Sequence, residues 1–343
     1  MTAAPAGAGI AFRTSGTTGE PVAWLRTETQ VRAEAELVLE CLLGPVDHVV
    51  SYAPTTHLYG YLYADVLPRL TGARVEHAWR DPIAPPRIPD GRRTLLVCLP
   101  STWEPLVRHT AELARHSGLI ALHSTGPTTP AAHRTVARLR GTGFRAVELL
   151  GSTETGAVAH RSVAPEGEPP PPWRLLPDVA WPGADRDGEQ RLRVSGPRLA
   201  RRWDQASPPA DHELSDLVIR AGERSFHHLG RAARLVKVNG RRCDLGRVEA
   251  LARTCGRGLD AACAAVPDPL RGEHYELYYA APDPALDPAV LRSRLARLGP
   301  DLPAPRAVHR VARIPRGATG KVLTSRLQAA AARPRPSQET DHG

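Results

Sequence analysis

Short apolar runs alternate with helix-like patterns over the first half of the chain. The runs occupy 49–53, 94–100, 118–127 and 145–156. The first two are each followed by a helix-like stretch, another helical pattern covers about 29–43, and the last two runs end in loops of small residues. This alternation predicts a sheet with helices on its faces and ligands at the loops beyond the strand ends.

The pattern changes at 163–173, which contains four consecutive prolines at 169–172. Because proline disrupts helices and central strands, we expect an exposed connector that closes the first α/β part. Beyond it, 188–197 and 213–222 alternate apolar and polar positions. That alternation is typical of antiparallel strands and predicts a smaller sheet or barrel.

A second change begins near residue 225, where the pattern becomes that of a small α+β module. We predict strands and helices in the following order along it: strands at 235–239, 260–267 and 274–282, helices at 246–254 and 288–299. The polar stretch 329–343 is expected to be a disordered tail. The fold class predicted is α/β: a layered α/β large domain with a small antiparallel subdomain, followed by a small α+β C-terminal domain.

Composition narrows the class of protein. A chain of 343 residues favours two domains. No apolar run approaches the ~18 residues of a membrane span, and the N-terminus lacks a basic segment followed by an apolar one. We therefore expect a soluble, cytoplasmic protein that does not bind membranes. The five cysteines are an odd number without a C-x-x-C pair, which indicates neither disulfides nor a zinc site.

The formal charge of +9 comes mainly from arginine. The arginines are scattered and no nucleic-acid motif accompanies them, so we do not expect a nucleic-acid partner. A basic surface suits ATP, coenzyme A or an acidic carrier protein. Only two of the 45 basic residues are lysines, Lys237 and Lys321. Lysine offers a compact point charge that can insert between two anionic oxygens. We therefore treat Lys237 and Lys321 as candidate functional residues.

A run of glycines and hydroxyls, T-S-G-T-T-G-E-P at 14–21, follows the first strand-like segment. Exposed backbone N–H groups and hydroxyls form a cradle for phosphate oxygens. The run lacks the G-K-[ST] of a Walker A loop. Taken alone, a run of glycine and threonine of this kind is more often only a turn.

The run resembles the phosphate loop of the adenylate-forming superfamily, which includes acyl-CoA synthetases, peptide-synthetase adenylation domains and luciferases. Further segments are similar to that family's motifs and follow in the family's order: P-T-T-H-L-Y-G at 54–60, S-T-G-P at 124–127, G-S-T-E at 151–154, L-S-D at 214–216, G-R at 230–231, V-K-V-N-G-R-R at 236–242, L-G-R-V-E at 245–249, and P-R-G-A-T-G-K at 315–321. The ordered set is far more specific than any one motif.

The resemblance implies roles for individual residues. Lys321 would bridge the attacking carboxylate and the α-phosphate of ATP, Glu154 would hold Mg²⁺, and Thr153 would contact the α-phosphate. The implied nucleotide-binding residues are Thr14, Ser15, Gly16, Thr17, Thr18, Gly19, Ser124, Gly126, Pro127, Gly151, Ser152, Asp216 and Arg231. Asp216 would accept the ribose hydroxyls, with Arg231 assisting. An ordinary strand-end role for Asp216 is the alternative.

Further residues are implied in the acid pocket and the hinge. His57, Tyr59 and Gly60 would line the acyl or thiol pocket, although His57 fits equally well as a packed residue. Ala233, Lys237 and Gly240 would belong to the hinge and the second half-reaction. His227 and His228 have no metal-spaced partners and are expected to be surface or hinge-loop residues. The implied domains are a truncated N-terminal adenylation domain at 1–229, a hinge at 230–234 and a mobile C-terminal domain at 235–328.

The chain departs from the family pattern in three places. Val22 stands where the phosphate loop usually continues with lysine, and Ala233 where an acidic residue is frequent. Only thirteen residues precede the phosphate loop, which implies a compact member lacking most of the usual N-terminal subdomain. We expect a homo-oligomer or a partner subunit to cover the face that this subdomain would bury.

The resemblance implies activation of a carboxylic acid by ATP to an acyl-adenylate. Transfer to a thiol would follow, either coenzyme A or the phosphopantetheine of an acyl carrier protein. Two alternatives stay open at this point: transfer to an amine, and a degenerate homologue that binds nucleotide without turnover. The aromatic residues near His57 hint weakly at an aryl or other hydrophobic acid.

Overall fold

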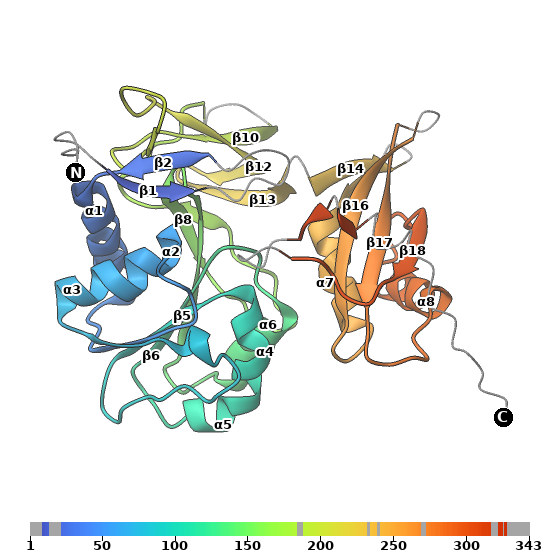
Figure 1. The fold of residues 1–343 in the computed structure, drawn as a ribbon, viewed down its shortest axis with the longest axis horizontal. Helices are drawn as coiled ribbons and strands as arrows, with labels where there is room; N and C mark the ends of the chain where they lie inside the picture. The colour runs from blue at the N-terminus through green and yellow to red at the C-terminus, as the bar shows by residue number, and fades with distance from the viewer. Residues whose placement is uncertain are drawn as a thin grey trace, which may run out of the picture. The chain divides into compact units, whose positions relative to one another are not determined.

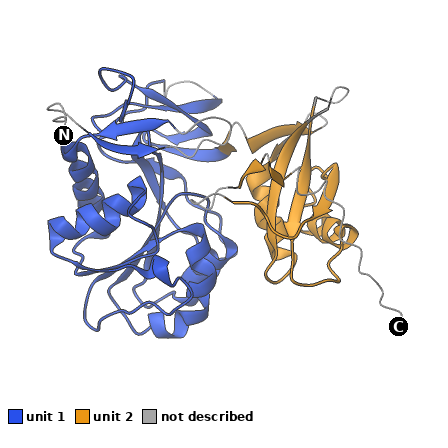
Figure 2. Ribbon diagram, viewed as in Figure 1, with its two compact units in different colours: residues 1–16, 20–229 blue, residues 17–19, 230–343 orange. Residues whose placement is uncertain are grey.

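The computed structural model describes residues 9–13, 22–183, 188–231, 234–238, 241–268, 272–316, 322–324 and 326–327. The chain forms two compact units, which divide between Leu229 and Gly230 (Figure 2). The predicted tail at 329–343 lies outside the described residues.

A ten-stranded mixed sheet forms the centre of the N-terminal unit (Figure 1). Neighbouring strands β4, β3, β5, β6 and β7 are parallel, and β7 pairs antiparallel with β8. In spatial order the strands are β10 (Glu189–Val194), β12 (His212–Gly222), β13 (Ser225–Arg231), β9 (Trp173–Leu175), β8 (Gly156–Ser162), β7 (Arg145–Ser152), β6 (Leu119–His123), β5 (Thr94–Cys98), β3 (His48–Ser51) and β4 (Arg74–Glu76). The predicted strands of the first half are confirmed.

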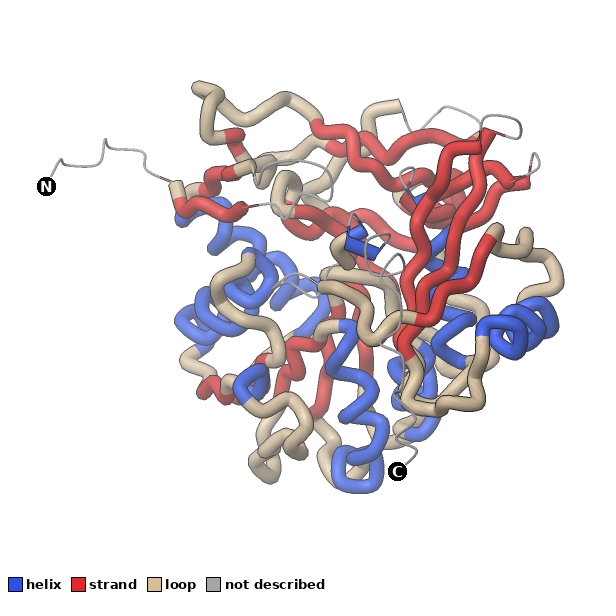
Figure 3. Tube along the Cα trace, turned by 45° about the vertical axis from the view of Figure 1, so that its right-hand side comes forward, coloured by secondary structure: helices blue, strands red, loops and turns tan. Residues whose placement is uncertain are grey.

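Helices α1 to α6 gather around the parallel strands of this sheet (Figures 1 and 3). The antiparallel strands β10, β12 and β13 form the other end of the sheet. The helices are α1 (Glu28–Val38), α2 (Leu58–Tyr61), α3 (Leu67–Thr71), α4 (Trp103–Leu106), α5 (Thr110–Leu113) and α6 (Pro130–Arg138). Helix α1 begins at a capping box, because the Thr27 hydroxyl accepts from the Gln30 N–H and the Gln30 side chain accepts from the Thr27 N–H. It continues as a π-helical turn, Leu39–Leu43, which completes the helix predicted at 29–43.

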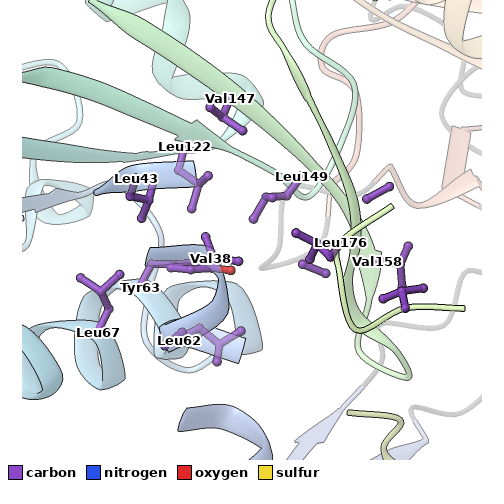
Figure 4. Close-up of a cluster of buried hydrophobic side chains, with 14 of the residues drawn as sticks. Val38, Leu43, Leu62, Tyr63, Leu67, Leu122, Val147, Leu149, Val158 and Leu176 are labelled. Carbon is purple, nitrogen blue, oxygen red and sulfur yellow. The ribbon is translucent and has the colours of Figure 1, made fainter. Parts of the chain in front are cut away.

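Alternate side chains of the parallel strands enter two separate cores. On β5, Leu95 and Val97 belong to the core with α1 to α3, whereas Leu96 and Cys98 belong to the core with α4 to α6. Figure 4 shows the first core, in which Tyr63 lies among the helix residues that face the strands. Burial on both faces explains why these strands read as continuous apolar runs.

The antiparallel strands predicted after the connector are present, but β10 and β12 extend the large sheet instead of forming a separate one. The connector joins β8 to β9, which pair with each other, so both of its ends lie in that sheet. A separate three-stranded sheet comes instead from β1 (Ile10–Arg13), β2 (Ala23–Arg26) and β11 (Arg201–Arg202). Alternation predicts which face of a strand is buried, but not which strand lies beside it.

The C-terminal unit is the predicted α+β module. Its sheet has the order β15-β14-β17-β16, with β18 parallel to β17. Its elements are β14 (Leu235–Val238), β15 (Arg241–Asp244), α7 (Leu245–Thr254), β16 (Asp260–Asp268), β17 (Gly272–Ala280), α8 (Pro288–Leu298) and β18 (Ala307–Arg310). Asp244 and Asp287 cap the two helices. The short strands β15 and β18 were not predicted.

Two negative findings concern the described residues. No helix in the described part of the chain is long and apolar enough to cross a membrane. All five cysteines lie within the described ranges, and none of them forms a disulfide, which agrees with the odd number and spacing in the sequence.

Burial of the central strands on both faces predicts the effect of shortening one of their side chains. Leu96→Ala should lower the free energy of unfolding by about 2–5 kcal/mol, because Leu96 is fully buried and the lost side chain leaves a cavity. Ile83 is 71% exposed, so Ile83→Ala should change it by less than about 0.5 kcal/mol. Urea unfolding of both variants measures the difference; equal losses would contradict the assignment of Leu96 to the core.

Candidate functional site

Three of the predicted motifs meet at the carboxyl edge of the parallel strands. The hydroxyl of Tyr59, on α2, donates to the carbonyl oxygens of Leu122 at 2.5 Å and Cys98 at 3.3 Å, near the ends of β6 and β5. The hydroxyl of Ser124, which follows β6, donates to the carbonyl of Leu149 on β7 at 3.2 Å. Burial raises the pKa of Tyr59 well above its ordinary value, so its hydroxyl keeps the proton that it donates.

Gly60 lets α2 approach the preceding loop closely. A β-carbon at this position would overlap the carbonyl oxygen of Pro54. His57 is the N-cap residue of the same helix, and its carbonyl accepts from the Tyr61 N–H at 2.8 Å. The glycine of P-x-x-H-x-x-G thus has a packing reason, and the motif is a tight strand-to-helix turn.

His123, the last residue of β6, anchors the loop 124–127. Its Nδ1 accepts from the indole N–H of Trp103 at 2.9 Å, and its Nε2 lies 2.9 Å from the carbonyl of Gly126. An indole can only donate, so Nε2 carries the proton and donates to Gly126. Thr125 has φ 76°, a strained conformation for a β-branched residue, and is held between these anchored positions.

Gly151 and Ser152 end β7, and Thr153 and Glu154 lie in the turn that leads to β8. Gly151 pairs with Ala157 across the two strands. The Ser152 hydroxyl lies 3.2 Å from that of Thr155, and the Ser152 N–H donates to the same Thr155 oxygen at 3.2 Å. Side-chain hydrogen bonds therefore fix the backbone of this turn.

The Glu154 backbone is tied as well, because its carbonyl accepts from the Ala200 N–H at 2.8 Å. Its carboxylate is half-buried and offers a hard oxygen donor. Within the described ranges, no group of three or more His, Cys, Asp or Glu side chains could hold a metal ion. A single carboxylate nevertheless fits Mg²⁺, which is commonly bound by one or two carboxylates together with substrate phosphates.

A buried group of charged residues behind this turn was not predicted. Arg26, Glu34 and Arg198 lie in different segments and are almost fully buried, and Arg26 donates to the carbonyl of Thr153. Local patterns give little sign of these residues, because their main partners, such as Thr153 and Ala157, are far away in the sequence. An arginine ending an apolar strand, as Arg26 does in A-W-L-R, was the one available signal.

Asp216 lies on β12 and is almost fully buried. Its Oδ1 accepts from Nε2 of His228, on β13, at 2.8 Å. The expectation that His228 is a surface or hinge-loop residue is therefore wrong: it is a strand residue, about three-quarters buried, that orients the carboxylate. Residues separated by twelve positions on neighbouring strands give no pattern in the sequence.

The remaining predicted residues belong to the C-terminal unit or lie outside the described ranges. Arg231 ends β13, and Lys237 is an exposed residue of β14 whose N–H donates to the Glu273 carboxylate at 3.0 Å. Outside the description lie Thr14, Ser15, Gly16, Thr17, Thr18, Gly19, Ala233, Gly240 and Lys321. The residues flanking the Lys321 segment, Arg316 and Val322, form an antiparallel bridge.

Comparison with known proteins identifies the family to which the chain belongs. The model of the AMP-binding enzyme family matches residues 10–188, which include the first sheet strands, the 124–127 loop and the 151–154 turn. The chain belongs to the AMP-binding enzyme family. The predicted membership of the adenylate-forming superfamily is confirmed, and the motifs at 54–60, 124–127 and 151–154 lie within the matched residues.

Curated relatives of this chain include two CoA ligases. It is 26% identical over 341 residues to the sulfoacetate–CoA ligase of Cupriavidus necator, covering 92% of this chain and 65% of the relative. It is 29% identical over 243 residues to a 4-coumarate–CoA ligase of Halorhodospira halophila, covering 70% of this chain and 55% of the relative. The chain thus spans less than two thirds of the length of these relatives.

Solved structures show that the fold is that of adenylate-forming enzymes. The anthranilate CoA ligase AuaEII in complex with anthranoyl-AMP matches with a TM-score of 0.72 and 16% identity, covering 94% of this chain and 67% of that one. McyG A-PCP complexed with phenylalanyl-adenylate matches with a TM-score of 0.73 and 12% identity, covering 96% and 67%. At these identities the likeness establishes the fold of the chain alone.

The anchor of the 124–127 loop predicts a pH dependence of stability. Burial lowers the pKa of His123 from its ordinary value of 6.5. Below pH 6.5, His123 is therefore protonated in the unfolded chain while it stays neutral in the folded chain. Stability should therefore fall as the pH drops from 7.5 to 5.5. In His123→Asn that fall should be smaller by roughly 1 kcal/mol. Denaturant unfolding at both pH values measures it.

The control for this experiment is His227→Asn, because His227 is exposed. It should keep the pH dependence of the native chain. An unchanged fall in His123→Asn would show that the ring of His123 is not held neutral.

Proposed function

We propose that this chain activates a carboxylic acid with ATP, forming an acyl-adenylate and releasing pyrophosphate. The observation that carries the proposal is the meeting of the 54–60, 124–127 and 151–154 motifs at one edge of the sheet, in a member of the AMP-binding family. Relatives named as CoA ligases and a neighbour solved with an acyl-adenylate support the same chemistry.

In this reaction an oxygen of the acid attacks the α-phosphorus of ATP, and the bond from that phosphorus to the pyrophosphate oxygen breaks. Two anions must meet, so the barrier falls where a cation bridges them. We assign this role to Lys321 and contact with the α-phosphate to Thr153. Mg²⁺, held by Glu154 and the nucleotide phosphates, would screen the charge of the leaving pyrophosphate.

Separate groups of residues would hold the phosphates, the adenine and the ribose of the nucleotide. We assign the phosphates to Thr14, Ser15, Gly16, Thr17, Thr18 and Gly19, the adenine to Ser124, Gly126 and Pro127 together with Gly151 and Ser152, and the ribose to Asp216 and Arg231. His228 supports the ribose role, because its hydrogen bond holds one Asp216 oxygen in a fixed direction. We assign the acid pocket to His57, Tyr59 and Gly60; Tyr59 would shape it with its ring, since its hydroxyl is engaged by backbone carbonyls.

The charge distribution favours an anionic acceptor for the acyl group. Residues 230–343 contain 20 Lys and Arg against 11 Asp and Glu, whereas residues 1–229 contain 25 of each. The whole net charge of the chain therefore belongs to the C-terminal part. A basic surface attracts the phosphates of coenzyme A or an acidic carrier protein carrying phosphopantetheine. We propose a thiol of this kind as acceptor, with Ala233, Lys237 and Gly240 serving the rotation of the C-terminal unit between half-reactions.

Replacing the bridging lysine tests the proposed reaction. Lys321→Ala should lower the rate of acid-dependent pyrophosphate exchange by about 100-fold or more, because the bridging charge acts in the transition state. Lys237→Ala is the matched control, since it removes the other lysine: it should keep exchange and slow only the transfer step. Hydroxamate trapping over aryl, fatty and amino acids identifies the acid. Undiminished pyrophosphate exchange in Lys321→Ala would contradict the role assigned to Lys321. Absence of exchange in the native chain with every acid would favour a degenerate homologue that binds nucleotide without turnover.

Salt dependence tests the anionic acceptor. The KM for the acceptor should rise several-fold between about 50 and 200 mM NaCl, because salt screens attraction between exposed charges. The KM of the acid serves as internal reference and should rise less. Coenzyme A, a phosphopantetheinylated carrier protein and simple amines are compared in parallel; an amine used best, with no effect of salt, would argue for amide formation instead.

A further inference from the structure

Four charged side chains form a network beside the segment 153–157, which comprises the turn after β7 and the first two residues of β8. Arg26 ends β2, Glu34 lies on α1, Asp178 follows β9 and Arg198 precedes β11. Exposure is 1% for Arg26, 1% for Glu34 and 3% for Arg198. The carboxylate of Glu34 lies between the two guanidinium groups, 3.4 Å from Arg26 and 3.2 Å from Arg198. Asp178 binds Arg198 through two hydrogen bonds, of 2.6 and 2.8 Å.

The network holds the backbone on both sides of Glu154. Arg26 donates to the carbonyl of Thr153 from Nε at 3.4 Å and from Nη2 at 3.3 Å. On the other side, Glu34 accepts from the Ala157 N–H at 2.7 Å, and Arg198 donates to the Ala157 carbonyl at 2.8 Å. A third backbone carbonyl, that of Arg198, accepts from Arg26 at 2.7 Å.

Gly156 makes this arrangement possible. Its φ of 70° is a conformation that favours glycine, and a β-carbon there would overlap the Glu34 carboxylate. The carboxylate therefore packs directly against the bare backbone of the turn. The contact leaves the 153–157 segment little room to shift relative to α1.

Stability alone is a poor reason for such a network. Burying an ion costs several kcal/mol before pairing repays it, and buried ion pairs can often be replaced by apolar residues without loss of stability. An apolar replacement here would leave the carbonyls of Thr153 and Ala157 without these donors. The forked guanidinium is suited to the task because it offers several donors in a fixed geometry.

The two arginines differ in how well their charge is compensated. At Arg198 burial acts to lower the pKa, but the hydrogen bonds to Asp178 and the charge of Glu34 outweigh it, and the pKa is raised. At Arg26 burial prevails and the pKa is lowered, with Glu34 and, more weakly, Glu154 acting against it.

We propose that Arg26, with Glu34 and Arg198, is a positioning device that sets the Thr153–Glu154 turn for the metal and the α-phosphate. The inference rests on the proposed function, because that function gives Thr153 and Glu154 their roles. Because Arg26 is 1% exposed and donates to the Thr153 carbonyl, it would act through the turn. It also joins the turn to β2, the strand that follows the phosphate-loop segment at 14–21.

The test compares Arg26→Met and Arg26→Lys with a stability control. Methionine keeps a long side chain but removes every donor, whereas lysine keeps the charge and loses the fork. Leu113→Ala is the control, because Leu113 is 1% exposed in the core with α4 to α6 and lies outside the network. All variants are first ranked by urea unfolding.

The first readout needs no turnover. Hydrogen exchange at the amides of 151–158, measured without nucleotide and relative to amides of β3, should be about tenfold faster in Arg26→Met than in Leu113→Ala. Arg26→Lys should fall between them. The second readout is the Mg²⁺ concentration for half-maximal pyrophosphate release, which should rise by about 10–100-fold in Arg26→Met and stay unchanged in Leu113→Ala.

The outcomes separate this inference from the proposed function. Equal local exchange and an equal Mg²⁺ requirement in Arg26→Met and Leu113→Ala overturn the positioning role. If the native chain releases no pyrophosphate with any acid, the proposed function fails, and the exchange measurement still decides whether Arg26 holds the turn. If Arg26→Met does not fold, the same comparison is decided on Arg26→Lys and on Glu34→Gln, which keeps an acceptor for the Ala157 N–H.

Discussion

The candidate site depends on how the backbone carbonyls at the ends of the buried strands find donors. A buried carbonyl without a donor is unfavourable, and the parallel strands end together at one edge. Tyr59 supplies the donor for carbonyls near the ends of β5 and β6, Ser124 for one on β7, and Arg26 for the turn that follows β7. Residues that close the sheet edge are thereby the same residues that arrange the proposed nucleotide site.

This constraint explains which parts of the molecule could be predicted. Strands β5 and β6 are buried on both faces, so their apolar runs are uninterrupted and visible in the sequence. The motifs follow these runs directly, so their place at the sheet edge follows from the alternation of strands and helices. In the C-terminal unit, β14, β16, β17, α7 and α8 were predicted because local pattern and tertiary burial agree there, whereas the four-residue strands β15 and β18 are too short to show a clear pattern.

The functional features that could not be predicted depend on contacts between residues that are separate in the sequence and meet only in the fold. The Arg26 network joins four segments between residues 26 and 198, and His228 meets Asp216 only because β12 and β13 are neighbours. Likewise, the alternation in β10 and β12 specifies a buried face but not the sheet to which they belong. A charged residue that is buried by distant partners looks, in the sequence, like an exposed one.

The structure shows a second use of the many arginines in the chain, as donors to backbone carbonyls. Arg224 donates to the carbonyls of Leu176 and Val179, and Arg310 to those of Ala281 and Asp283, in the same way that Arg26 serves its turn. Arginine is therefore used here as a multiple donor for loop backbone, beyond supplying positive charge. Lysine cannot satisfy several carbonyls in a fixed fork. The role that we propose for Lys321, a compact charge between two anions, is one for which lysine is better suited than the broad guanidinium of arginine.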